Sequence, residues 1–380
     1  MMQLSTESKS ELIQRGFSRR HFGRFATMLA AGATLPFYNE SAMAQLSMVK
    51  GMPPDAVKIN ANENPLGPCA EAAEAMHNII SKGGRYLYEE TFGFEETMAE
   101  LEGLKPSYVR PFAGSSAPLH QAVLAFTSPT KSFVTADPGY EAGERAAKFI
   151  GANVVRVPLT KTYAHDVAAM AKADPNAGLI YVCNPNNPTG TLTPRADIEF
   201  LLKNKPAGSI LLLDEAYIHI SGAPMASDLV AADKDIIILR TFSKLYGMAG
   251  LRAGAALGRP DLLNKIMPYS AGALPVTGMV GATTSLKVKD LVAKRRKIIA
   301  DVREDTFAYL DKHNFKYVPS VSNKFMVDVG RPGEEVAEAM RKHKVYIGRV
   351  WKSWPTYVRV SIGTQEEMNK FKTAFSAVMS

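Results

Sequence analysis

Three uninterrupted apolar runs constrain the fold of this chain more than any other feature of its sequence. They predict strands over residues 179–183, 209–213 and 235–239, and polar residues follow each of them closely. Apolar runs of this length between helical stretches are typical of strands that are buried on both faces of a parallel sheet. Ligands of open α/β sheets bind at the carboxyl ends of such strands. We therefore expect the residues that follow the three runs to form one site.

The same alternation of short apolar runs and helical patterns extends from residue 107 to about 258. Further strands are predicted at 108–112, 132–136, 152–157 and 253–257. This rhythm predicts an α/β fold with a mainly parallel, doubly wound sheet.

The pattern changes after residue 275. A long helical stretch over 276–312 is followed by short strands near 315–328 and 345–361 and a closing helix over 364–378. A chain of 380 residues is long for one core. We therefore predict a large domain and a smaller α+β domain behind an extended, Pro- and Asn-rich arm. The predicted boundaries are 45–68 for the arm, 69–275 for the large domain and 276–380 for the small domain.

The first 44 residues resemble a twin-arginine export signal. Arg19 and Arg20 precede an apolar stretch over 25–37 that is too short to span a bilayer, and Ala42-Met-Ala44 supplies small residues for cleavage. Such signals are read by a receptor that recognises paired arginines, so the resemblance implies export of the folded protein to the periplasm and cleavage after Ala44. No stable membrane association is then expected. The alternative is an ordinary amphipathic N-terminal helix.

The net charge of +8 forms no long block that would indicate a nucleic-acid partner. The densest basic cluster, residues 294–297, lies in a helical stretch, and we predict that it is a solvated helix face. The two cysteines and seven histidines show no metal-ligand spacing, so no metal site is expected.

A lysine and an aspartate follow two of the apolar runs. Small and apolar residues follow Lys244, so its amine would be desolvated, which lowers the pKa of an amine and makes it nucleophilic toward an aldehyde. Asp214 could be a simple helix cap, or it could pair with a protonated pyridine nitrogen. Tyr217 and Asn187 could hydrogen-bond a phenolate oxygen. Together these groups are suited to hold pyridoxal phosphate, with Lys244 forming the Schiff base.

A second group of residues could hold the phosphate. Ser115 and Ser116 follow a predicted strand and open a helix, where backbone N–H groups and hydroxyls can cradle an anion. The alternative is a simple serine N-cap. Ser243 and Arg252 could complete the phosphate shell beside the lysine. Tyr140 could stack on the cofactor ring or pack in the core.

These motifs, in this order, resemble the fold type I, class I/II aminotransferases that depend on pyridoxal phosphate, and most closely their histidinol-phosphate aminotransferase-like subgroup. The resemblance covers roughly residues 50–380. It is carried by residues 60–65, 183–190, 214–217 and 241–252. It implies that Lys244 is the catalytic Schiff-base lysine and proton shuttle. The cofactor-binding residues that it implies are Ser115, Ser116, Tyr140, Asn187, Asp214, Tyr217, Thr241, Ser243 and Arg252.

The resemblance also implies a homodimer and a substrate site. Tyr86 would reach the partner's phosphate, although Leu87 replaces the usual proline and Tyr88 could take its place. Arg359, within residues 357–363, would grip a carboxylate or phosphate bidentately. Substrate-binding positions are also implied for Arg349 and Asn62.

The expected reaction moves an amino group from an α-amino acid to a 2-oxo acid. The runner-up is a pyridoxal-phosphate-dependent oxidase, or another enzyme using this cofactor, that acts on a basic amino acid. A non-enzymatic alternative, such as a cofactor-sensing regulator or a periplasmic amino-acid binding protein, would need a DNA-binding domain or a dispensable lysine. Specificity depends on pocket shape, so the sequence does not name the amino donor.

Overall fold

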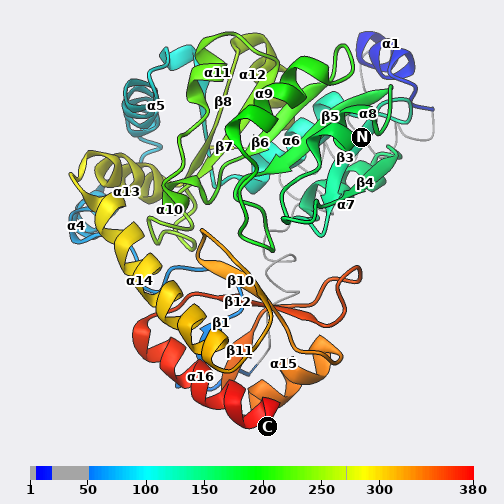
Figure 1. Cartoon of the computed structure of the whole chain (residues 1–380). Helices are drawn as coiled ribbons and strands as arrows, with labels where there is room; N and C mark the ends of the chain where they lie inside the picture. The colour runs from blue at the N-terminus through cyan, green and yellow to red at the C-terminus, as the bar shows by residue number, and fades with distance from the viewer. Residues whose placement is uncertain (1–5, 19–50, 271) are drawn as a thin grey trace.

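The computed structural model describes residues 6–18, 51–270 and 272–380. The centre of its larger part is a seven-stranded sheet with the order β2-β8-β7-β6-β5-β3-β4 (Figure 1). The strands are β2 (Val109–Phe112), β3 (Ser132–Asp137), β4 (Val154–Pro158), β5 (Ala177–Cys183), β6 (Ile210–Asp214), β7 (Ile236–Thr241) and β8 (Gly254–Gly258). All seven predicted strands are confirmed, with shifts of a few residues at their ends.

The sheet is mixed because β8 runs antiparallel to both of its neighbours, β2 and β7, whereas β7, β6, β5, β3 and β4 are mutually parallel. Residues 242–253 join β7 to β8 without a crossover helix, so the chain turns back beside β7. A parallel neighbour would require a longer crossover connection. The prediction of a mainly parallel sheet is therefore confirmed, with one reversed strand.

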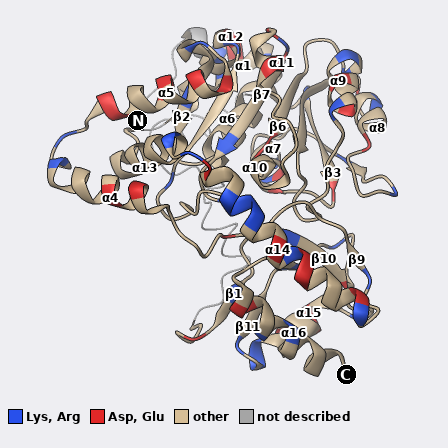
Figure 2. Ribbon diagram, turned by 60° about the vertical axis from the view of Figure 1, so that its left-hand side comes forward, with Lys and Arg blue, Asp and Glu red and all other residues tan. Residues whose placement is uncertain are grey.

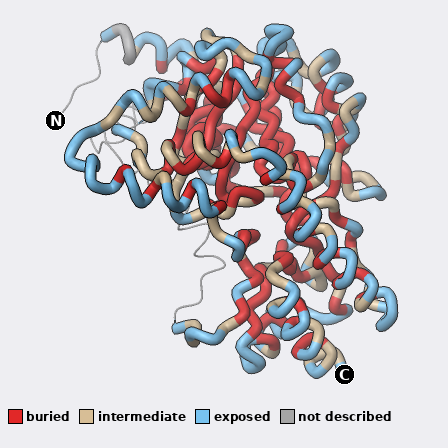
Figure 3. The backbone as a smooth tube through the Cα atoms, turned by 90° about the vertical axis from the view of Figure 1, so that its left-hand side faces the viewer, coloured by how far each residue is buried: buried red, intermediate tan, exposed pale blue. Residues whose placement is uncertain are grey.

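The central strands are buried on both faces, as their continuous apolar sequences predict. Every residue of β5, β6 and β7 is buried, and buried backbone fills the middle of the larger part in Figure 3. Helices cover the sheet (Figure 1). The α-helices between residues 70 and 266 are α4 (Ala70–Ile79), α5 (Tyr88–Glu102), α6 (Ser116–Phe126), α7 (Ala142–Phe149), α8 (Val167–Lys172), α9 (Arg195–Asn204), α10 (Ile218–Ser221), α11 (Ser227–Ala231) and α12 (Pro260–Ile266).

The predicted helical stretch over 276–312 is two helices, α13 (Val276–Lys287) and α14 (Leu291–Lys312). Asp290, between them, has a φ of 59°, a left-handed conformation that an α-helix does not contain. The two helices have different neighbours. Helix α13 packs on α4 and α5 beside the large sheet, whereas α14 contacts both α10 and the C-terminal α16 (Gln365–Met379).

The smaller part contains an antiparallel sheet of order β12-β10-β9, formed by β9 (Tyr317–Val318), β10 (Lys324–Asp328) and β12 (Tyr357–Ser361). Helices α14, α15 (Gly333–Lys342) and α16 lie in this part (Figure 1). The N-terminal arm joins it, because β1 (Val57–Ile59) pairs in parallel with β11 (Val345–Ile347). The arm therefore runs between the two parts of the molecule.

The first described segment, residues 6–18, lies against the larger part and contains α1 (Thr6–Gln14). Arg15 donates hydrogen bonds to the carbonyl groups of Leu124, Ala125 and Thr127, at the C-terminal end of α6. The predicted export motif at Arg19 and Arg20 and the predicted cleavage site lie outside the described residues. No helix within the described ranges is long and apolar enough to cross a membrane.

Candidate active site

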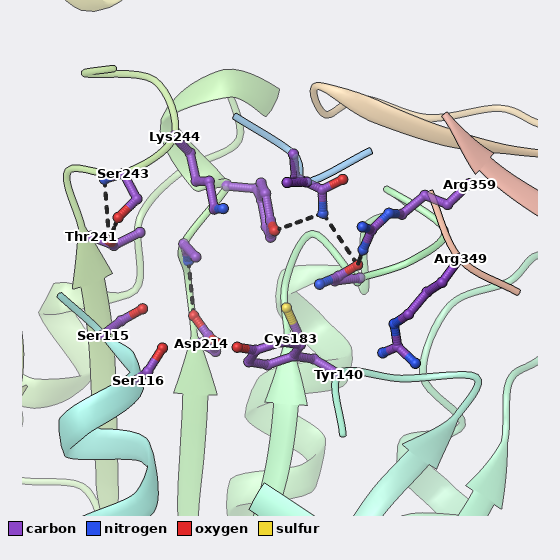
Figure 4. Close-up of a pocket in the computed structure, with 15 residues that line it drawn as sticks. Ser115, Ser116, Tyr140, Cys183, Asp214, Thr241, Ser243, Lys244, Arg349 and Arg359 are labelled. Carbon is purple, nitrogen blue, oxygen red and sulfur yellow. Dashed lines mark hydrogen bonds between the residues drawn. The ribbon is translucent and has the colours of Figure 1, made fainter. Parts of the chain in front are cut away.

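One cavity at the carboxyl ends of the central strands brings most of the predicted site residues together (Figure 4). Of the predicted residues, those that line it are Asn62, Ser115, Ser116, Tyr140, Asn187, Asp214, Tyr217, Thr241, Ser243, Lys244, Arg349 and Arg359. Arg252 and Tyr86 are not among the lining residues. We call the side formed by Ser115, Asp214, Thr241 and Lys244 the sheet end. The side formed by Asn62, Asn187 and Arg359 is the arm end.

Lys244 follows β7, and its amine points into the cavity (Figure 4). Although the side chain as a whole is only partly buried, the amine lies deep, 5.7 Å from the centre of the Tyr217 ring. Desolvation lowers the pKa of Lys244 to about 8, and the charge of Arg359 acts in the same direction. A large fraction of the amine is therefore neutral near pH 8, which is the form that attacks a carbonyl carbon.

Asp214 ends β6, at the centre of the same sheet edge. Its Oδ2 accepts a hydrogen bond from the Tyr181 hydroxyl at 2.8 Å, and its Oδ1 accepts one from the Ala216 N–H at 3.1 Å. Burial raises the pKa of this carboxyl, although the Tyr181 bond partly opposes the shift. The carboxylate thus has a capping bond and also lines the cavity. A cation placed in the cavity would offset the cost of burying its charge.

A buried ion-pair network fixes the strand ends that carry these two residues. Arg240 of β7 pairs with Glu215, which follows Asp214, and with Glu102 of α5. All three side chains are almost completely buried. Removing one partner of such a network leaves an uncompensated buried charge and typically costs about 3–5 kcal/mol. The network therefore holds the ends of β6 and β7 in fixed relation.

The basic cluster at 294–297 was expected to be a solvated helix face, and this is wrong for Arg295. Its side chain is buried, and its Nη1 donates to the carbonyl oxygen of Leu245, the residue after Lys244. Asn64 Nδ2 donates to the same carbonyl at 2.8 Å. In Figure 2 the Lys and Arg residues of α14 lie where this helix passes between the two parts. Tertiary packing, which helical periodicity does not reveal, buries the arginine.

The serine and threonine hydroxyls form a cradle suited to an anion. Ser115 is the N-cap residue of α6 but makes no side-chain capping bond, so the structure does not support the simple-cap alternative. Thr241 Oγ1 donates to Ser243 Oγ at 3.0 Å. Arg252 lies behind them, with its Nη1 at 3.4 Å from Ser243 Oγ and its Nη2 donating to the carbonyl of Ala113.

A glycine makes room for this arginine. A Cβ on Gly114 would lie 2.3 Å from Arg252 Nη2, and the φ of Gly114 is +90°. Any larger residue at this position would push the guanidinium out of place and would itself be strained.

A hydrogen-bonded network lines the arm end. Asn187 Oδ1 accepts from Arg359 Nη1 at 3.0 Å and from Asn62 Nδ2 at 3.4 Å, and Asn62 Nδ2 also donates to the Tyr217 hydroxyl at 3.2 Å. Arg359 Nη2 donates to the carbonyl of Asn60, whereas its buried Nε has no hydrogen-bond partner within the described part of the chain. Desolvation lowers the pKa of Arg359 to about 10. A buried guanidinium with an unused donor is suited to receive an anion.

Two other predicted residues are placed differently. Arg349 lines the cavity, but its guanidinium already pairs with Glu141 and lies 4.1 Å from the Trp351 ring centre. Tyr86 is 71% exposed and stacks on Tyr88, with 5.6 Å between the ring centres. Its predicted role toward a partner's site stays a prediction.

Two residues of the site environment were missed by the sequence reasoning. Tyr181, inside β5, holds Asp214, and the only signal was its position two residues before the end of an apolar run. Lys324 opens β10 and is completely buried, with its Nζ 3.0 Å from the centre of the Tyr217 ring. A lysine at the start of an apolar strand was a visible signal, but its sequence position alone did not indicate that it would be buried near Lys244.

The donor set fits pyridoxal phosphate. The hydroxyl cradle at the start of α6 can receive a phosphate, the buried Asp214 can receive a protonated ring nitrogen, and Lys244 supplies an amine of lowered pKa. Tyr217 and Asn187 line the cavity where a phenol oxygen would need donors.

Comparisons with known proteins agree with this geometry. The family model described as aminotransferase class I and II matches residues 54–375. A histidinol-phosphate aminotransferase of Moorella thermoacetica is 31% identical over 369 residues, which cover 92% of this chain and 94% of the relative. An aromatic amino acid aminotransferase of Cutibacterium acnes is 31% identical over 330 residues, covering 85% of this chain and 92% of the relative.

Solved structures give the same result. A putative histidinol-phosphate aminotransferase from Erwinia carotovora superposes with a TM-score of 0.81 at 29% identity, covering 84% of this chain and 94% of that chain. The histidinol-phosphate aminotransferase of Sinorhizobium meliloti, solved in complex with pyridoxal-5'-phosphate, gives a TM-score of 0.78 at 25% identity, covering 95% of this chain and 99% of that chain.

Proposed function

Because the chain belongs to the class I and II aminotransferases, enzymes that use pyridoxal phosphate, we propose that this cavity transfers the amino group of an α-amino acid to a 2-oxo acid with Lys244 as the catalytic base. One observation carries the proposal. The Lys244 amine, whose pKa is lowered to about 8, lines the same cavity as the buried Asp214 carboxylate and the Arg359 guanidinium. Amine, acid and anion receptor are the groups that this reaction requires.

Lys244, Asp214 and Tyr217 have separate roles in the proposed reaction. Pyridoxal phosphate, when bound, supplies an aldehyde and a ring that accepts the electron pair of a broken Cα–H bond. With the cofactor bound, Lys244 Nζ would take the proton from the substrate Cα and hold it for its return. Asp214 would hold the ring nitrogen in its protonated form, and the Tyr217 hydroxyl would donate to the phenol oxygen. These roles follow from the positions of the side chains around one cavity.

The arm end receives the substrate. The Arg359 guanidinium is held by Asn187 and by the Asn60 carbonyl and lines the cavity, so it is positioned to bind a carboxylate. One relative is named a histidinol-phosphate aminotransferase and another an aromatic amino acid aminotransferase. The export that the N-terminal sequence predicts argues against a role in cytoplasmic histidine biosynthesis, so we propose an α-amino acid as the donor.

The working unit that we propose is a homodimer in which Tyr86 reaches the partner's phosphate. The support is an exposed aromatic surface on α5 and the preceding turn. Tyr86 is 71% exposed, Tyr88 54% and Phe92 60%. Aromatic side chains exposed side by side are typical of protein interfaces.

We also propose export to the periplasm by the twin-arginine route, with cleavage after Ala44. The support is the sequence order of paired arginines, apolar stretch and small residues. Changing Arg19→Lys together with Arg20→Lys should leave a folded, cofactor-loaded enzyme in the cytoplasm, which cell fractionation measures. Export and cleavage of the doubly substituted protein would refute the proposal.

A donor screen tests the reaction. The cofactor-loaded protein is incubated with α-amino acids and histidinol phosphate against pyruvate and 2-oxoglutarate, and peroxide is monitored in parallel. We expect an α-amino donor whose conversion depends on the 2-oxo acid and yields the new amino acid in equal amount. Conversion that needs oxygen and no 2-oxo acid, with peroxide formed, would instead identify an oxidase.

A further inference from the structure

Lys324 is a second lysine near the site, and the proposed reaction does not use it. It opens β10, its side chain is completely buried, and its Nζ lies 3.0 Å from the centre of the Tyr217 ring. The Lys244 amine lies 5.7 Å from the centre of the same ring. Tyr217 is therefore contacted by one lysine and approached by another.

The surroundings of Lys324 offer little compensation for a charge. Its Nζ donates one hydrogen bond, to Ser322 Oγ at 3.0 Å, and it forms no salt bridge within the described ranges. The remaining polar contact of the amine is the aromatic face of Tyr217. A lysine that is fully buried without a carboxylate partner is costly, so its retention here calls for a function.

The groups that face Lys324 come from four other elements. Asp214 ends β6 and favours the charged amine, whereas Cys183, which ends β5, is a thiol whose pKa is raised by burial and so carries no charge that could do the same. Arg359 of β12 and Lys244 after β7 oppose it. Desolvation is the largest influence, and together these effects hold the pKa of Lys324 well below its usual value. When the Lys244 amine loses its charge, one of the opposing charges disappears and Lys324 binds a proton more readily.

A proton on Lys324 would act on Tyr217 directly. A cation against the face of a phenol ring stabilises negative charge on the ring and its oxygen, so the hydroxyl becomes a stronger donor. The Tyr217 hydroxyl lies in the arm-end network, where it accepts a hydrogen bond from Asn62 Nδ2. Its own proton is available for an acceptor in the cavity.

We propose that Lys324 is a positioning residue that, through the face of the Tyr217 ring, sets how strongly the Tyr217 hydroxyl donates to the phenol oxygen of the bound cofactor. The inference rests on the proposed contact between Tyr217 and that oxygen. The inference adds an electrostatic coupling between two lysines: Lys244 reacts, and Lys324 adjusts the charge near the reacting groups.

The test measures the pH at which the visible absorbance of the bound cofactor changes. Lys324→Met removes the amine and should raise this pH by about 0.5–1 unit, the size expected of a desolvated cation–π contact. Lys324→Arg fixes a positive charge at the ring and should lower it. Lys324→Gln keeps a donor for Ser322 without the charge, and it replaces the methionine variant if that variant does not fold.

Two controls separate the possible failures. Lys265, whose Nζ lies 5.9 Å over the Phe126 ring and which does not line the cavity, provides a matched variant, Lys265→Met, that should leave the absorbance titration unchanged. Tyr217→Phe should move the titration if the phenol touches the cofactor. If it does not, the assignment of Tyr217 fails.

If Tyr217→Phe moves the titration but none of the Lys324 variants does, the inference about Lys324 is overturned. In the Tyr217→Phe background, Lys324→Met should have a clearly smaller effect than in the wild type. An undiminished effect would mean that Lys324 acts on the cofactor without Tyr217. Cofactor retention, measured by equilibrium dialysis, should stay within about threefold of wild type in the Lys324 variants, because none of them touches the hydroxyl cradle.

Discussion

The sheet end and the arm end of the cavity are assembled in different ways. Residues of the sheet end lie at or just after the ends of β6 and β7 or at the N-cap of α6, and one continuous buried sheet positions them. The arm end is assembled from the N-terminal arm, the loop after β5, and β12. The catalytic residues therefore lie at one edge of a rigid sheet. The residues proposed to recognise the substrate come from segments that meet only in the folded molecule. Changes at the two ends should therefore differ in kind.

Of the substitutions at the sheet end, Lys244→Ala should have the largest effect on activity. Turnover should fall by roughly 10²–10⁴-fold, the range that a positioned acid–base group contributes. Borohydride treatment should no longer fix the cofactor to the protein, and in the wild type the fixed cofactor should map to the peptide that contains Lys244. An adduct at wild-type level in the variant would remove this assignment.

Asp214→Asn keeps the shape of the sheet end and removes its charge. A charge-assisted hydrogen bond contributes about 1.5–3 kcal/mol, so amino transfer should slow by roughly 10- to 100-fold. Circular dichroism should stay unchanged, because Asn Oδ1 can still accept from the Ala216 N–H while its Nδ2 can donate to the Tyr181 hydroxyl oxygen. Activity within a few-fold of wild type would reduce Asp214 to a structural cap.

Arg359→Lys tests the arm end alone. The substitution replaces a planar guanidinium, which can bind a carboxylate with two hydrogen bonds, by an ammonium group that acts as a point charge. The kcat/KM for α-amino acids should therefore fall by about 10- to 100-fold, while cofactor spectra stay the same. A matched amine without the carboxylate should show almost no loss. Equal losses for both compounds would mean that the main role of Arg359 is to hold Asn187 and the Asn60 carbonyl.

The pH dependence of cofactor uptake reports on Lys244. Its pKa is lowered from 10.5 to about 8, so the amine is protonated below pH 8 and neutral above it. Because only the neutral amine attacks an aldehyde, uptake by the cofactor-free protein should rise with pH and level off above 8. At pH 7 it should be about tenfold slower than on the plateau. Stopped-flow absorbance measures this, and an inflection near pH 10.5 would contradict the lowered pKa.

Tyr86→Phe should have the smallest effect. If this hydroxyl reaches the partner's phosphate, its loss should weaken cofactor retention by roughly 2- to 12-fold, the value of one hydrogen bond. Tyr88→Phe is the matched control, because Tyr88 stacks on Tyr86 and is also exposed. A loss confined to Tyr88→Phe would show that the neighbouring tyrosine has the role instead.

The difference between the two ends also explains what could be read from the sequence. The strands were predictable because strands buried on both faces carry continuous apolar sequences, and Asp214 and Lys244 were predictable because they follow such strands. The antiparallel direction of β8 was missed because the direction of a strand depends on the connection that precedes it. The apolar sequence of the strand does not indicate whether it pairs in parallel or antiparallel.

The sequence did not predict which side chains are buried by contacts between segments that are far apart in the chain. Lys324 is buried because its strand lies against Tyr217, and Arg295 is buried because α14 passes next to Leu245. Both side chains belong to residue types that are usually exposed, so local composition favours the wrong answer. The domain boundaries, the partner's tyrosine and the export signal stay predictions.

The pairing of β1 with β11 has a consequence for how a newly made chain is completed. Arg359 and the Asn60 carbonyl, which meet in the arm end, are 299 positions apart, and the partner strand of β1 lies equally late in the sequence. During synthesis the large sheet can form first, while the arm waits for a partner that has not yet been made. A truncation before residue 345 would therefore leave the hydroxyl cradle and Lys244 without the arm end of the cavity, where we propose that the substrate binds. In this sense a strand made late in synthesis, β11, decides whether β1 has a place in the enzyme.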